Sequence, residues 1–219
     1  MRFLLTIFTV LYCTLSFVSC DNDDYVYPSV ITEFIDACTD ESGTLSSFRT
    51  DQGESLFIQP REGISGLRED TTYRTVSTYQ IIDETPGQNR IMLYTCQLIP
   101  AMIPQKIENF LLGIKTDPVG IQSIWRSGEY LNMILLIKHK DQSHAFHFVD
   151  EEITVDADQN KTLNLRLYHN RYNDYEAFTI KYYLSVPLWH YKDILNEGDK
   201  IRFHINTYEE GQTVREFQY

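Results

Sequence analysis

The stretch YPSVITEFIDACTDESGTLSSFRTDQGESLFIQP, residues 27–60, contains three short apolar–polar alternations separated by turn sequences. Alternation with a period of two is typical of β-strands that bury one face, and ESG and DQG hold residues that tight turns favour. The stretch therefore predicts three consecutive antiparallel strands. Residues 71–100 repeat the pattern on both sides of the turn ETPGQ, which predicts a hairpin. A three-stranded meander followed by a hairpin gives five strands, the number in an OB-type barrel. We expect such a barrel over residues 27–104.

The segment IPAMIPQKIENFLLGIKTDPVG, residues 99–120, interrupts this alternation with three prolines and indicates a junction between two domains. More strand patterns follow it, and in one of them Leu163, Leu165 and Leu167 alternate with Asn164, Arg166 and Tyr168. Sheets with one buried face fit this pattern, so we expect an antiparallel β-sandwich over residues 105–219 and an all-β protein. Only the stretch VPLWHYKDILNEG predicts a helical turn.

The charge balance of the chain excludes one class of partner. Asp and Glu number 31 against 19 Lys and Arg, and the formal net charge is -12. Nucleic-acid affinity comes largely from cation contacts with phosphates, so we expect no nucleic acid as partner.

The first residues, MRFLLTIFTVLYCTLSFVS, place Arg2 before an apolar run that ends at Val18. The run is shorter than the roughly 20 apolar residues of a membrane-spanning helix and predicts a signal peptide over residues 1–19. A short anchoring helix that stays in place is the alternative. The next residues complete the sequence FVSC, which resembles a bacterial lipobox. This resemblance implies that Cys20 carries lipid and anchors the protein to the outer membrane.

An acidic linker follows the cysteine over residues 20–26. Asp21, Asp23 and Asp24 fit a solvated linker, which is the usual meaning of a charge run. Acids at this place also resemble the export signal with which Bacteroidetes-type bacteria send lipoproteins to the outer face of the outer membrane. We therefore expect a lipid-anchored protein that faces the cell exterior, with the periplasmic face as the alternative.

A family resemblance rests on the start CDNDD, on residues 27–58 and on the stretch SIWRSGEYLNMILLI, residues 123–137. Together these residues resemble the NigD-like lipoproteins of Bacteroidetes-type bacteria. The resemblance implies an OB-type barrel followed by a β-sandwich, in a family named after a protein encoded beside a bacteriocin. It brings no established activity and no catalytic residues, and only the anchor cysteine transfers, onto Cys20.

Common catalytic motifs are missing from the sequence. It contains no GxSxG elbow, HExxH helix, P-loop or dinucleotide fingerprint. The acid pairs at predicted strand ends, such as Glu209 and Glu210, would serve a glycosidase only if they faced each other across a cleft. We expect no catalytic residues and no enzyme, and a hydrolase with an unrecognised site stays the open alternative.

Six histidines raise the question of a metal site. His144 and His147 would point to opposite faces of an extended strand, so this pair cannot bind one ion. His139, His169 and His204 lie on other predicted strands and would assemble a site only through a strand register that the sequence does not reveal. We expect surface or core histidines, no metal and no cofactor.

The stretch YHNRYNDYE, residues 168–176, predicts a hairpin tip rich in aromatic side chains. Aromatic faces beside amide and guanidinium groups are suited to a glycan or a protein partner. The candidate ligand-binding residues are Tyr168, Arg171, Tyr172, Asn173 and Tyr175. The alternative is that these side chains only pack at the end of the sandwich.

Two cysteines remain beyond the anchor and the signal peptide. Cys38 lies on the first predicted strand of the barrel and Cys96 on the last, and we expect these strands to be neighbours where the barrel closes. An oxidising envelope permits a disulfide between them, and buried thiols are the alternative.

These observations favour a non-catalytic, lipid-anchored envelope protein that binds an unknown glycan or protein through a barrel face or the sandwich loops. The family resemblance supports a second function, that of a bacteriocin-associated accessory or self-protection lipoprotein.

Overall fold

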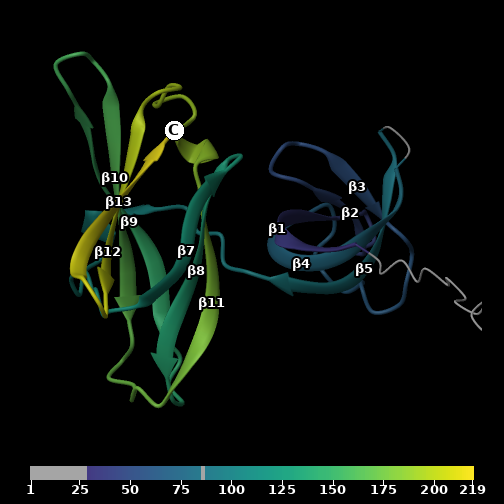
Figure 1. The fold of residues 1–219 in the computed structure, drawn as a ribbon, viewed down its shortest axis with the longest axis horizontal. Helices are drawn as coiled ribbons and strands as arrows, with labels where there is room; N and C mark the ends of the chain where they lie inside the picture. Colours follow the sequence, from purple (N-terminus) through teal and green to yellow (C-terminus); the bar gives the residue numbers. More distant parts are fainter. Residues whose placement is uncertain (1–28, 85–86) are drawn as a thin grey trace, which may run out of the picture.

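The computed structural model describes residues 29–84 and 87–219, which form a barrel and a pair of packed sheets (Figure 1). The expected signal peptide and the linker with Cys20, Asp21, Asp23 and Asp24 lie outside the described residues. Within these residues the regular secondary structure is almost entirely β-strand, and no helix has the length and hydropathy to span a bilayer. The expected all-β fold is confirmed.

Five of the described strands form the barrel. They are β1 (Val30–Thr39), β2 (Leu45–Arg49), β3 (Ser55–Ile58), β4 (Thr72–Asp83) and β5 (Asn89–Leu98). The hydrogen-bonded order is β1-β2-β3-β5-β4, and β4 closes the barrel against β1. The meander and the hairpin are antiparallel, as the turn sequences predict, and β3 pairs with β5 in parallel. The inward residues of the alternation, among them Ile35, Phe48 and Ile91, fill the interior, which confirms the OB-type barrel.

The remaining described strands form two sheets. The three-stranded sheet has the order β11-β8-β7 and the other sheet has the order β13-β12-β10-β9-β6. The bounds are β6 (Gln105–Lys106), β7 (Gly120–Ser127), β8 (Tyr130–His139), β9 (Ala145–Val155), β10 (Lys161–Asn170), β11 (Phe178–Pro187), β12 (Lys200–Thr207) and β13 (Gly211–Gln218). Two short 3-10 helices accompany them, η1 (Ile107–Asn109) and η2 (Trp189–Tyr191). The second of these is the helical turn expected in VPLWHYKDILNEG.

The core of the sandwich lies between the two sheets. Leu163, Leu165 and Leu167 of β10 are buried, as the alternation predicts, and they belong to one cluster with Leu131 and Leu135 of β8. Burial of each such side chain contributes about 1.5–3 kcal/mol.

The sandwich is not purely antiparallel, and this part of the expectation is wrong. β10 pairs with β12 in parallel, and β6 pairs with β9 in parallel. The reason is that β11, which lies between β10 and β12 in the chain, belongs to the opposite sheet. The chain therefore returns to the first sheet in its original direction, as parallel pairing requires.

The expected disulfide is also wrong, because β4 lies between the two cysteine-bearing strands. Cys38 pairs with Thr72 of β4, and Cys96 pairs with Ser77 on the other side of the same strand. A five-residue offset along a strand corresponds to about 16 Å, whereas the Cα atoms of a disulfide lie within about 7 Å of each other. Both cysteines are free thiols.

A buried arginine joins the barrel to the sandwich. The side chain of Arg74, on β4, has 0% exposure, and its Nη1 lies 3.1 Å from Oδ1 of Asp36 and 2.7 Å from Oδ1 of Asp51. Its Nη2 donates a hydrogen bond of 3.0 Å to Oδ1 of Asn132 on β8. The guanidinium carbon lies 3.9 Å from the ring centroid of Tyr130, also on β8. One cation therefore bonds to both parts of the molecule.

The turn between β7 and β8 approaches the barrel closely at Gly128. This glycine has a φ of +52°, and a Cβ added there would lie less than 3.0 Å from the backbone carbonyl oxygen of Asp51. Nearby, the ring of Phe34 on β1 packs edge-on against Trp125 of β7, with centroids 4.9 Å apart. Glycine at this position is what allows the two parts to dock.

Gly128→Ala should reduce the free energy of unfolding by about 2–4 kcal/mol, because it combines a left-handed backbone with overpacking against rigid backbone. Gly211→Ala is the matched control, since Gly211 has a φ of +70° and no atom within 4 Å of an added Cβ. Its cost should be about 1 kcal/mol, from the backbone alone. Urea unfolding of both variants measures the difference, and equal losses would contradict a tight contact at Gly128.

Both cysteines of the barrel should react as thiols. We expect alkylation of the chain, unfolded in denaturant without reductant, to label the peptides that contain Cys38 and Cys96, because β4 separates the two strands. Mass spectrometry of the peptides measures the labels. A cross-linked pair of peptides lighter by two hydrogens would refute the observed strand order.

Candidate functional site

Two connections between the sheets lie together at one end of the sandwich. Residues 140–144 connect β8 with β9, and residues 171–177 connect β10 with β11. The last residue of β8 pairs with the first residue of β11, and the first residue of β9 pairs with the last residue of β10. Both connections therefore start and end at the same end of the sandwich, and their polar side chains meet there.

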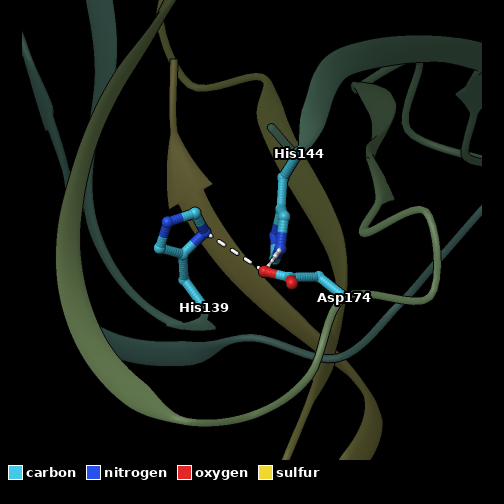
Figure 2. Close-up of side chains that lie close together, drawn as sticks. All are labelled: His139, His144 and Asp174. Atoms are coloured by element: carbon cyan, nitrogen blue, oxygen red, sulfur yellow. Dashed lines mark hydrogen bonds and ion pairs between the residues drawn. The ribbon is translucent and has the colours of Figure 1, made fainter. Parts of the chain in front are cut away.

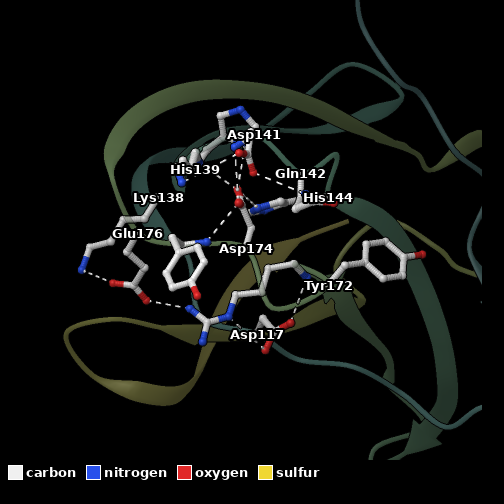
Figure 3. Close-up of polar contacts among 12 residues, drawn as sticks. Asp117, Lys138, His139, Asp141, Gln142, His144, Tyr172, Asp174 and Glu176 are labelled. Carbon is white, nitrogen blue, oxygen red and sulfur yellow. Dashed lines mark hydrogen bonds and ion pairs between the residues drawn. The ribbon is translucent and has the colours of Figure 1, made fainter.

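Asp174 is the central residue of this end. Its side chain has 0% exposure and lies beside Asp141 and His144 of the other connection (Figure 3). The backbone N–H groups of Lys140 and Tyr175 donate hydrogen bonds of 2.8 and 2.9 Å to its two carboxylate oxygens. Burial raises the pKa of Asp174, but the backbone N–H groups of Lys140, Asp141 and Gln142 outweigh burial and hold this pKa well below its usual range. Asp174 is therefore an ionised, buried carboxylate.

Two histidines point at the same oxygen of this carboxylate (Figure 2). Nδ1 of His139 and Nε2 of His144 each lie 3.2 Å from Oδ2 of Asp174. The side chain of His144 is 4% exposed and that of His139 is 25% exposed. The ligand-type atoms of the three residues all lie within 4.8 Å of one another. In the described part of the chain, these are the residues that could hold a metal ion.

His144 is oriented from behind by a second ring. Its Nδ1 lies 2.9 Å from Nε2 of His169, and Nδ1 of His169 lies 2.8 Å from the backbone oxygen of Asp117. Burial lowers the pKa of His169 to about 4, so this ring is neutral at physiological pH. A carbonyl oxygen only accepts, so Nδ1 of His169 carries its hydrogen and Nε2 accepts the hydrogen on Nδ1 of His144.

A chain of ion pairs borders the site. Lys138 lies 2.8 Å from one oxygen of Glu176, and Arg171 lies 2.8 Å from the other oxygen. The backbone N–H of Arg171 donates to the side chain of Asp117 at 2.8 Å. Exposed pairs of this kind contribute little to stability, and here they join the connection 171–177 to β8.

The residues expected to bind a ligand do not share one surface. Tyr172 and Tyr175 are 57% and 74% exposed, and Asn173 between them is also exposed. Tyr168 belongs to β10 itself, and its ring packs against Phe110 with centroids 5.2 Å apart. Tyr168 therefore lies apart from the exposed pair.

The sequence predicts a hairpin tip for the stretch that carries the two exposed tyrosines, and this prediction is wrong. β10 pairs with β9 and β12, whereas β11 pairs with β8 in the other sheet. Residues 171–177 therefore cross from sheet to sheet. This crossing is the reason that Asp174 reaches the two histidines.

The expectation from sequence missed the group formed by His139, His144 and Asp174. His144 and His147 do lie apart, because His144 precedes β9 while His147 packs edge-on against Phe110 at 5.8 Å. The sequence held one indication of this group: His139 lies at the end of one strand pattern and His144 at the start of the next, so a tight connection would bring them together. The pairing of β8 with β11, which brings Asp174 to them, has no signature in the sequence.

Comparison with known proteins identifies the C-terminal half and relates the whole chain to solved structures. The model of the NigD-like C-terminal beta sandwich domain matches residues 102–219. The chain is similar to a NigD-like immunity protein from Bacteroides caccae ATCC 43185, with 31% identity and a TM-score of 0.70. That alignment covers 89% of this chain and 99% of the other.

Two solved structures of lower identity share the fold. One, from Parabacteroides distasonis ATCC 8503 and provisionally called toxin-related, has 17% identity, a TM-score of 0.63 and coverage of 87% of this chain and 93% of its own. The other, from Bacteroides fragilis NCTC 9343 and provisionally called a lipoprotein, has 16% identity, a TM-score of 0.59 and coverage of 88% and 97%. The comparison with curated proteins found no match. The domain match and the Bacteroides caccae structure together place this chain in the NigD-like family.

Proposed function

We propose that this chain is a non-catalytic, lipid-anchored binding protein of the cell envelope, and that its partner is a protein. The observation that carries the proposal is the exposure of Tyr172 and Tyr175 on the connection 171–177. Tyrosine is enriched at protein interfaces, because a large ring with a polar tip binds well at low entropic cost. Phe178, 52% exposed at the start of β11, adds a third aromatic side chain near this end.

Local hydrogen bonds order the connection 171–177. Tyr172 and Asn173 have φ values of +52° and +61°, a conformation that costs energy for residues other than glycine and is often found at functional sites. The backbone N–H of Tyr172 donates to the side chain of Asn170 at 2.9 Å, and the next residue but one is the buried Asp174. A pre-ordered loop loses little entropy on binding, so its exposed rings contribute more to affinity.

Two similarities support the kind of partner and the anchor. The Bacteroides caccae relative is called a NigD-like immunity protein, which supports a self-protection function in which the partner is a bacteriocin. The Bacteroides fragilis structure is provisionally called a lipoprotein, which supports lipid attachment at Cys20. The formal net charge of -12 favours a cationic partner, because long-range attraction raises the rate of encounter.

The double variant Tyr172→Ala/Tyr175→Ala should weaken partner capture by about tenfold or more, since truncation of an aromatic anchor costs at least about 2 kcal/mol. Tyr94→Ala is the matched control, because Tyr94 is 42% exposed on the barrel. Pull-down with the full chain from producer-strain supernatants, beside a glycan array, measures the effect.

The melting temperature of the double variant should stay within about 2 °C of the parent, as is usual for surface substitutions. A fall of several degrees with unchanged capture would mean that the tyrosines only pack. If the double variant instead lost binding on the glycan array and no protein was captured by the parent, the partner would be a glycan.

The anchor and the acids should separate in a localisation experiment. Cys20→Ala should abolish labelling with a fatty acid, because the lipid is attached at this residue. Replacement of Asp21, Asp23 and Asp24 with alanine should keep the lipid but remove display on the outer face. Protease shaving of intact cells measures display, and equal digestion of parent and triple variant would reduce the acids to a linker.

A further inference from the structure

We propose that His139, His144 and Asp174 bind a divalent transition-metal ion, and that zinc is the ion that fits best. The site is distinct from the exposed tyrosines, and the inference stands on the geometry of three side chains from two connections and one strand end.

His144 and Asp174 direct ligand-type atoms at each other. Nε2 of His144 lies 3.2 Å from Oδ2 of Asp174, and Nδ1 of the same ring lies 2.9 Å from Nε2 of His169. The contact with His169 therefore holds the ring from behind and leaves Nε2 directed at the carboxylate. An imidazole nitrogen and a carboxylate oxygen in this arrangement are two ligands of a metal site.

His139 supplies the third ligand-type atom at the same oxygen. Its Nδ1 also lies 3.2 Å from Oδ2 of Asp174, and this oxygen already accepts the backbone N–H of Lys140 at 2.8 Å. Two ring nitrogens and one backbone N–H therefore surround a single carboxylate oxygen. A metal ion bound by both ring nitrogens takes one lone pair of Oδ2 and leaves the other for Lys140.

The distances are those of a zinc site. Zinc binds histidine nitrogen and carboxylate oxygen at about 2.0–2.2 Å, so tetrahedral ligand atoms lie about 3.3–3.5 Å apart. Both nitrogen–oxygen distances are 3.2 Å. The two nitrogens lie within 4.8 Å of each other, and His139, which is partly exposed at the end of β8, can turn to close this gap. The fourth ligand position is left to water.

The ligand set and its support select the class of ion. Two imidazole nitrogens and one carboxylate suit zinc and its neighbours, whereas calcium and magnesium prefer oxygen ligands alone. His144 is held by His169, and the carboxylate of Asp174 is held by backbone N–H groups. Metal ligands are ordinarily fixed by such outer hydrogen bonds, which make the site ready before the ion binds.

Zinc binding by the full chain, purified in detergent and stripped with a chelator, tests the proposal. Competition with a chromophoric chelator and elemental analysis should find one Zn²⁺ per chain. His139→Ala should lower the affinity by at least about tenfold, and His190→Ala is the matched control, because His190 is exposed and lies outside the group. His139 is chosen since its removal leaves the buried Asp174 and His144 in place.

Circular dichroism checks that the variants fold, and His139→Gln provides the same comparison if His139→Ala melts early. Co²⁺ in place of Zn²⁺ should give the visible absorption of a tetrahedral site, lost in His139→Ala and retained in His190→Ala. Equal zinc binding by parent and His139→Ala, or none by the parent, would overturn the site. These readouts need no partner, so they fail or succeed independently of the proposed function.

Discussion

The relative placement of barrel and sandwich depends on the buried guanidinium of Arg74. It bonds to Asp36 and Asp51 in the barrel and to Asn132 in the sandwich. Both carboxylates are almost fully buried with it, and removal of one member of such a group leaves an uncompensated charge that costs about 3–5 kcal/mol. The planar fork of arginine also sets direction, because its parallel N–H groups bond to Asp51 through both oxygens. Arg74 and its partners thus hold the barrel and the sandwich in one orientation, because each buried charge is compensated only while the others are in place.

This constraint extends along one pair of strands to the other end of the sandwich. Asn132 accepts a hydrogen bond of 2.7 Å from Ser185, its partner residue on β11. The same ladder continues for seven residues, or about 23 Å, until His139 pairs with Phe178. The register that Arg74 supports at one end therefore sets where His139 and the start of β11 lie at the other. Interface and candidate site are two ends of the β8–β11 pair.

At that far end, one connection carries both the exposed tyrosines and a member of the buried group. Asp174 lies between Tyr172 and Tyr175 in the chain, and its Oδ2 lies 3.2 Å from a ring nitrogen of each histidine. Its backbone partners come from the connection 140–144, so the two connections are tied together through one carboxylate. An ion at this carboxylate and a partner on the tyrosines would act on a single rigid unit. The backbone that carries the exposed rings is joined to the buried acid, because the N–H of Tyr175 donates to Asp174.

The sequence by itself determined the local structure of this protein. The alternation in residues 27–60 and at Leu163, Leu165 and Leu167 specifies strands and their buried faces, because the side-chain period of two is a property of the strand alone. The turns ESG, DQG and ETPGQ then specify the meander and the hairpin, and the resemblance of the CDNDD start and two later stretches indicated the family. Only the tertiary structure decided which strands are neighbours. The closure of β4 on β1 separates Cys38 from Cys96, and the crossing of β11 to the opposite sheet makes β10 and β12 parallel. The same crossing brings Asp174 to His139 and His144, which precede it in the chain by 35 and 30 residues. Pairing over such separations depends on how whole sheets bury their faces against each other, and no local pattern of residues records it.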